Sequence, residues 1–108
     1  MKQLNDILFI TEVARNISNY CNRITAIESY DNAKSIANFA IGHIDCCITY
    51  MNCMLSTENN DFTGMLDEVT GKWYSEVYQA LIDTADRLGQ GPDVIRSLCE
   101  KRDEFALD

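Results

Sequence analysis

Apolar residues recur along the chain at alternating spacings of three and four positions, as in a helix that packs lengthwise against another helix. This pattern predicts four helices, at about residues 5–28, 31–55, 65–88 and 92–105. No stretch of useful length alternates apolar and polar residues, as a half-buried strand would. The sequence therefore predicts an all-α fold, a four-helix bundle within a single domain over residues 1–108.

The connections between these helices are short. The first two helices meet at the residues SYDN, 29–32, where the serine and the aspartate can each cap a following helix. So short a link predicts an antiparallel hairpin of two long helices. The turn-rich stretch STENNDFTG, residues 56–64, is expected to be a loop before a third long helix. GQGP, residues 89–92, should end that helix, with Pro92 at the first position of a short C-terminal helix.

Residues 41–55, IGHIDCCITYMNCML, raise the question of a metal or redox site, because they contain the single histidine and three of the five cysteines. A structural zinc site needs four converging ligands, and the chain has no CxxC pair, so no metal site is predicted. No basic residue lies close in sequence to lower a thiol pKa, which disfavours a redox role. On a helix, the apolar arc and a narrow polar strip are separated by Phe39, His43, Cys46, Tyr50 and Cys53. We expect this segment to be hydrophobic core, with only the polar strip in water.

The sequence contains little that could carry catalysis. It has no glycine-rich phosphate loop, and the motifs GxSxG, HExxH and DxDxDG are absent. His43 and Cys46 lie one helical turn apart, but Asp45 belongs to the polar strip and points away from them. The prediction is a protein that is not an enzyme, with no catalytic residues and no cofactor.

Charge is the strongest feature of the composition. Acidic residues outnumber basic ones 17 to 9, which gives a net charge of −8. Residues 1–55 contain five acids and four bases, whereas residues 56–108 contain twelve acids and five bases, so the net charges are −1 and −7. Such a chain should repel nucleic acid and attract basic proteins. In the alternative explanation, the acidic excess serves only to keep the chain soluble.

The third helix has a second apolar ridge outside its expected core line. The ridge is made of Tyr74, Tyr78, Leu81 and Ala85, and acidic residues run around it. Tyrosines among carboxylates suit a surface that binds a basic protein. The predicted partner-binding residues are Glu58, Asp61, Asp67, Glu68, Tyr74, Glu76, Tyr78, Asp83 and Asp86. In the alternative interpretation, the tyrosines pack under the fourth helix and the acids form an ordinary solvated face.

The expected location is the cytoplasm. The start, MKQLNDILFITEV, lacks the features of a signal peptide. The most apolar window, residues 36–55, still carries Asn38, His43, Asp45 and Asn52, so no membrane span is predicted. An odd number of cysteines without regular spacing fits reduced thiols better than a disulfide framework.

In size, charge, cysteine usage and lack of catalytic motifs, the chain resembles the bacterial immunity proteins that neutralise nuclease toxins. The resemblance is one of general style, and no motif assigns particular residues. It implies a basic nuclease as the partner, with its active site covered and no direct contact to nucleic acid. Two alternatives stay open. One is a phage anti-defence inhibitor that imitates nucleic acid, and the other is a helical homo-oligomeric interaction module, such as a homodimer.

Overall fold

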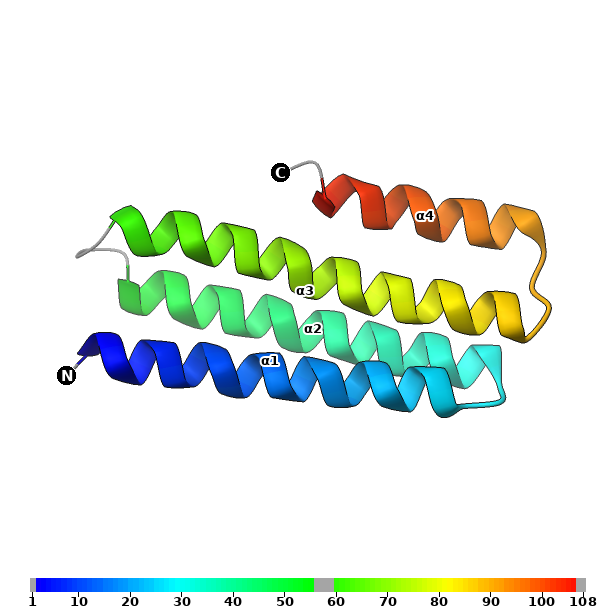
Figure 1. Cartoon of the computed structure of the whole chain (residues 1–108), viewed down its shortest axis with the longest axis horizontal. Coiled ribbons are helices and arrows are strands. Elements are labelled where there is room, and N and C mark those ends of the chain that lie inside the picture. Colours follow the sequence, from blue (N-terminus) through cyan, green and yellow to red (C-terminus); the bar gives the residue numbers. More distant parts are fainter. Residues whose placement is uncertain (1, 56–59, 107–108) are drawn as a thin grey trace.

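The described part of the chain consists of four α-helices and their connections. The computed structural model describes residues 2–55 and 60–106, with side chains described within 8–50 and 69–104. The helices are α1 (Lys2–Ala26), α2 (Tyr30–Leu55), α3 (Asn60–Arg87) and α4 (Pro92–Ala106) (Figure 1). No strand occurs within these ranges, and the predicted all-α fold is confirmed.

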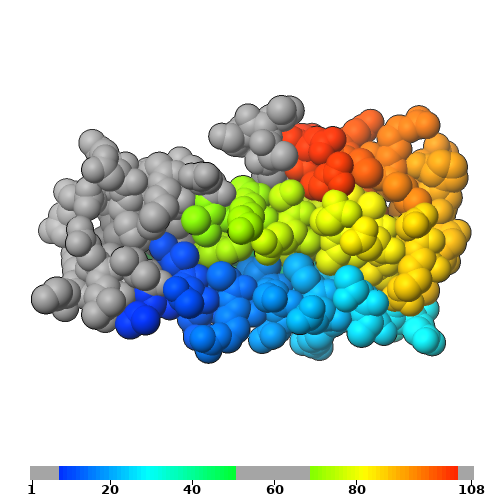
Figure 2. Space-filling view, in the orientation of Figure 1, coloured from blue at the N-terminus to red at the C-terminus, as the bar shows by residue number. Residues whose placement is uncertain are grey.

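The helices pack around α3. Helices α1, α2 and α3 each contact the other two, whereas α4 packs against α3 alone within the described residues. Figure 1 shows α4 running along the side of α3 that lies away from α1. In the space-filling view, α1, α3 and α4 lie side by side on the near face, and α2 is largely hidden behind them (Figure 2). The bundle is therefore three mutually packed helices with a fourth laid against one of them.

The turn between α1 and α2 is fixed by side chains of the turn and of α3. The hydroxyl of Ser29 accepts a hydrogen bond from the backbone N–H of Asn32 (3.4 Å), so Ser29 caps α2 as predicted. The guanidinium of Arg87 donates to the carbonyl oxygens of Thr25 (2.9 Å) and Ile27 near the end of α1. A cation is favourable there because the last carbonyls of a helix are unpaired and carry partial negative charge. Together these bonds position the hairpin against α3.

The turn between α3 and α4 is set by Gly89, whose φ is 77°. The N–H of Gln90 donates to the carbonyl of Ala85 (2.9 Å), and that of Gly89 donates to the carbonyl of Asp86 (3.2 Å). This is the pair of bonds of a Schellman motif, which requires the left-handed conformation that glycine adopts without strain. Pro92 then begins α4, as predicted.

Helix α3 begins earlier than the sequence indicated. Its first residue is Asn60 rather than about Met65, so much of the stretch predicted as a loop is helical. Asparagine and aspartate are favoured at helix starts as well as in turns, so composition alone did not separate the two structures. The connection that precedes α3 is correspondingly shorter.

The core is formed by the facing sides of α1, α2 and α3. Among its fully buried members are Ile17 and Ile24 of α1, Ile44 of α2 and Val77 of α3. Leu81 and Ala85 are also buried, with 3% and 0% of their surface exposed. The expectation that they form a ridge outside the core is therefore wrong. The reason is that α3 has neighbours on three sides, so its buried face is wider than that of a helix with one partner.

Helix α2 is less enclosed than expected. Cys47 is buried and Ile44 is fully so, but Phe39 is 67% exposed, Tyr50 is 54% exposed and Cys46 is exposed. The prediction that only the polar strip of α2 faces water is wrong. Only α1 and α3 pack against α2, and the fourth helix that would have covered this side lies on α3 instead.

Thr84 links α3 to α1 through a buried hydroxyl. Thr84 is 1% exposed, and its one hydroxyl proton is shared between the carbonyl of Ala80 in its own helix (2.8 Å) and that of Ile24 in α1 (3.1 Å). Burying a hydroxyl costs free energy unless it is hydrogen-bonded. This bond therefore fixes how α3 is placed along α1.

We expect Thr84→Val to lower the free energy of unfolding by about 1–2 kcal/mol, because the shape is kept while the interhelical bond is lost. Thr49→Val is the matched control. Thr49 is exposed and donates only to the carbonyl of Asp45 in its own helix (3.0 Å). Urea unfolding followed by circular dichroism measures both changes. Equal effects of the two substitutions would contradict the role given to the α1–α3 bond.

Candidate functional site

The nine predicted partner-binding residues fall into two groups. Glu58, Asp61, Asp67 and Glu68 lie outside the residues whose side chains the structure describes. The other five are described, and all of them lie on α3. They are Tyr74, Glu76, Tyr78, Asp83 and Asp86.

The two tyrosines are half-buried, and carboxylates of the neighbouring helices lie close enough to affect the pKa of each. The hydroxyl of Tyr74 donates a hydrogen bond to Oδ1 of Asp45 in α2. Burial raises the pKa of Tyr74 above its ordinary value of 10, and the bond to Asp45 raises it further. Burial also raises the pKa of Tyr78, and the charges of Glu104 in α4 and of Asp45 add to the shift. We call Asp45, Tyr74, Tyr78 and Glu104 the tyrosine–carboxylate cluster.

The three described acids of α3 do not join this cluster. Glu76, Asp83 and Asp86 are all exposed. At about 100° per residue, Asp83 lies half a turn away from Tyr74, on the opposite side of α3. Glu76 lies on the α1 side, where its charge adds to burial in raising the pKa of Cys21 to about 11. Glu76 and Asp83 therefore lie on the side of α3 away from the tyrosines, whereas Asp86 lies about 80° around the helix from Tyr78.

The carboxylates that do accompany the tyrosines were missed in the sequence. Asp45 is 29 residues from Tyr74, and it was assigned only to the polar strip of α2. Its place on that strip could have indicated the contact. An acidic residue beside the buried face of a helix lies where a side chain of a neighbouring helix can reach it. Glu104 carried no signal of its own. Its position depends on the direction in which α4 leaves the Gly89 turn.

A second surface, on the α1–α2 side, is aromatic rather than acidic. Phe9 of α1 packs on Tyr50 of α2 with ring centroids 5.3 Å apart, and Tyr20 of α1 packs on Phe39 of α2 at 5.8 Å. Between these pairs, the ring of His43 lies 6.0 Å from that of Tyr20. We call the five residues the aromatic strip. Tilted and edge-on contacts at these distances are favourable aromatic arrangements.

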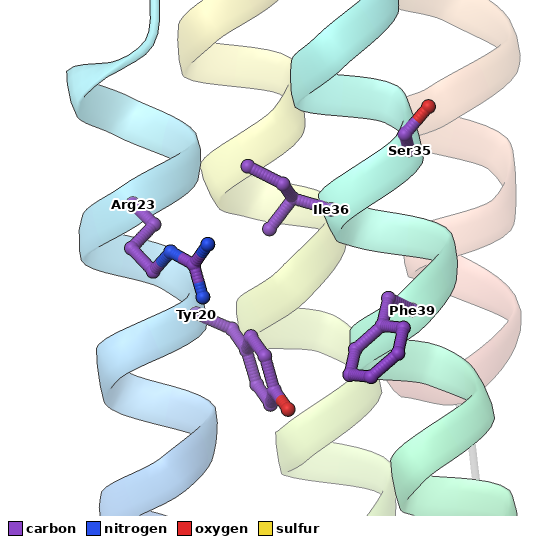
Figure 3. Close-up of a pocket in the computed structure, with 5 residues that line it drawn as sticks. All are labelled: Tyr20, Arg23, Ser35, Ile36 and Phe39. Atoms are coloured by element: carbon purple, nitrogen blue, oxygen red, sulfur yellow. The ribbon is translucent and has the colours of Figure 1, made fainter.

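An open pocket of about 320 Å³ lies at one end of the aromatic strip, between α1 and α2. Figure 3 shows Ile36 pointing from α2 into the space between the helices, with the rings of Tyr20 and Phe39 next to each other further along that space. Arg23 and Ser35 complete the lining. The pocket is mainly apolar, with one cation at its edge.

Among the described residues, the histidine of α2 has one close contact with a cysteine. Nε2 of His43 lies 3.8 Å from Sγ of the buried Cys47, while Cys46 is exposed on the aromatic side. No group of three or more metal-ligating residues occurs in the part of the chain that the structure describes. The four described cysteines are free thiols. Burial raises the pKa of Cys47, which disfavours the reactive thiolate form.

Comparison with known proteins gives no relative. No protein-family model, no curated protein and no solved structure matches the chain. Among the described helices, none has an apolar stretch of the length that crossing a membrane requires.

The Tyr74–Asp45 contact leads to a prediction about pH. Because the pKa of Tyr74 is higher in the folded than in the unfolded chain, its contribution to stability is present below pH 10. That contribution is lost as the pH rises above 10, so the free energy of unfolding should fall there, and Tyr74→Phe should reduce the fall. We also expect Asp45→Asn to lower the pKa of Tyr74, as measured by NMR titration of ¹³C-labelled tyrosine. Glu76→Gln, on another side of α3, should leave that pKa unchanged. An unchanged value in Asp45→Asn would contradict the contact.

Proposed function

We propose that this chain is a non-enzymatic inhibitor that binds a basic protein and covers its active site. The partner that fits best is a nuclease toxin, which would make the chain an immunity protein. The observation that carries the proposal is the tyrosine–carboxylate cluster, in which two half-buried tyrosines of α3 lie with Asp45 of α2 and Glu104 of α4.

The cluster has the chemistry that recognition of a basic partner needs. Half-buried tyrosines are already ordered, so they add apolar contact area on binding at little entropic cost. A carboxylate has two oxygens and about four acceptor positions, so Asp45 can keep its bond to Tyr74 and also accept one from an arginine. Asp45 and Glu104 would therefore bind cations beside an aromatic surface.

The net charge of −8 acts at longer range. A nuclease must present a basic cleft to the phosphates of its substrate, and an acidic protein is drawn towards such a cleft. Long-range attraction raises the association rate, and the close contacts at the cluster slow dissociation. A cytoplasmic location is part of the proposal, because a toxin is neutralised where its nucleic acid substrate lies.

A phage inhibitor that imitates nucleic acid is the second candidate, and the same acidity supports it. Imitation of a duplex needs regularly spaced negative charge along much of the molecule. Residues 1–55, however, have a net charge of only −1. The confined position of the cluster therefore favours an inhibitor that covers one site.

The proposal is tested with a panel of purified ribonuclease and deoxyribonuclease toxin domains. We expect one of them to lose its activity when mixed with an equimolar amount of the chain, and the complex to weaken as salt is added. The double variant Asp45→Asn, Glu104→Gln should raise the Kd of that complex at least tenfold, about 1.4 kcal/mol. Calorimetric titration and the nuclease assay measure the two effects.

The matched control is Glu76→Gln, Asp83→Asn, which removes two charges from other sides of α3. Its Kd should stay within about threefold of the unmodified chain, since only long-range attraction changes. If this control weakens the complex as much as the cluster variant, the contact does not lie at the cluster. If no nuclease in the panel is inhibited, the proposed function is wrong.

A further inference from the structure

The large apolar side chains that the described part of the chain leaves in water are confined to α1 and α2. They are Leu8, Phe39 and Tyr50, with 57%, 67% and 54% of their surface exposed. Phe39 and Tyr50 alone leave on the order of 200 Å² in water, since an aromatic side chain carries about 150–250 Å². Isolated exposed apolar residues are ordinary, but aromatic side chains gathered on one face mark an interaction site.

The aromatic strip is long and regular. On α2, Phe39, His43, Cys46 and Tyr50 follow one another at spacings of four, three and four, which places them along one side of the helix. The Phe9–Tyr50 and Tyr20–Phe39 pairs are separated by eleven residues on each helix, or roughly 16 Å at 1.5 Å per residue. The strip therefore has a similar aromatic pair near each of its ends.

Charge indicates which partner this strip suits. The acidic excess of the chain lies in residues 56–108, whereas residues 1–55, which form α1 and α2, have a net charge of −1. Two copies of a chain with a net charge of −8 repel each other least when they meet through the side that carries the least charge. At the pocket itself a basic partner would meet a cation, since Arg23 is part of the lining.

We propose that the aromatic strip is a homodimer interface occupied by a second copy of this chain. A two-fold axis across the middle of the strip would set each aromatic pair against the other pair of the second copy, as an isologous interface requires. A strip about 25 Å long and two helix diameters wide offers on the order of 500 Å² per copy. The two copies together would bury about 1,000 Å², which is less than a standard specific interface, so the dimer is weak and depends on concentration.

The position of Cys46 provides an independent measurement. It is exposed and lies on the same side of α2 between Phe39 and Tyr50, near the middle of the strip. In the proposed dimer the two copies of Cys46 lie close to the axis and to each other. A short bis-maleimide, which adds to one thiol at each end, should link them.

The test measures mass against concentration by sedimentation equilibrium. We expect the full chain to pass from monomer to dimer between about 1 μM and 1 mM, and Phe39→Asp to raise the dimer Kd at least tenfold. Asn38→Asp is the matched control. Asn38 is exposed and next to Phe39 in sequence, and its substitution adds the same charge on the polar strip of α2. The control should dimerise like the unmodified chain. Circular dichroism checks that both variants are folded.

Several outcomes would overturn the proposal. A chain that stays monomeric throughout this range, or a Phe39→Asp variant that dimerises as strongly as Asn38→Asp, shows that no second copy occupies the strip. If the chain is monomeric, any partner of the strip is a different protein. A bis-maleimide product that persists in Cys46→Ser places the contact elsewhere.

The dimer does not rest on the proposed inhibitory function, and salt separates the two. Added salt screens the repulsion between two acidic copies, so the dimer should strengthen or stay unchanged. The complex with a basic nuclease should weaken under the same conditions. Loss of one behaviour with retention of the other identifies which proposal fails.

Discussion

The structure depends on α3, which packs against all three of the other helices. Helices α1, α2 and α4 all pack against α3, and α4 has no other neighbour among the described helices. The packing is fixed by buried contacts of Val77 and by the hydrogen bond from Thr84 to α1. Because α3 rotates by about 100° per residue, each of its faces belongs to one neighbour. This assignment decides that Tyr74 meets Asp45 and that Glu76 lies towards α1.

Much of the fold could be predicted from the sequence because helices that pack lengthwise have apolar residues at regular spacings of three and four. The three-and-four spacing located all four helices, and Pro92 and Ser29 marked helix starts that the structure confirms. The start of α3 was placed too late because residues that form turns also begin helices. The sequence also did not show that α4 lies on α3 alone. Periodicity reports that a helix has a buried side and does not say which helix covers it.

The candidate site was less predictable for the same reason. Tyr74 and Tyr78 were identified from their own helix, but their carboxylate neighbours come from α2 and α4. Such a contact joins residues 29 positions apart and depends on the tertiary arrangement. Phe39 and Tyr50 show the converse. Their residue types predicted core, yet they are exposed because no helix covers that side of α2. An apolar residue at a regular spacing indicates a contact surface, and only the structure shows whether the partner is in the same chain.

The single neighbour of α4 has a consequence for how tightly any ligand of the cluster would be held. Local opening of α4 would leave the mutual contacts of α1, α2 and α3 in place, so it would cost less than global unfolding. It would also carry Glu104 away from Tyr78. A ligand that bridges Asp45 and Glu104 would therefore act as a clamp on the last helix, and part of its binding energy would appear as protection of α4 from hydrogen exchange.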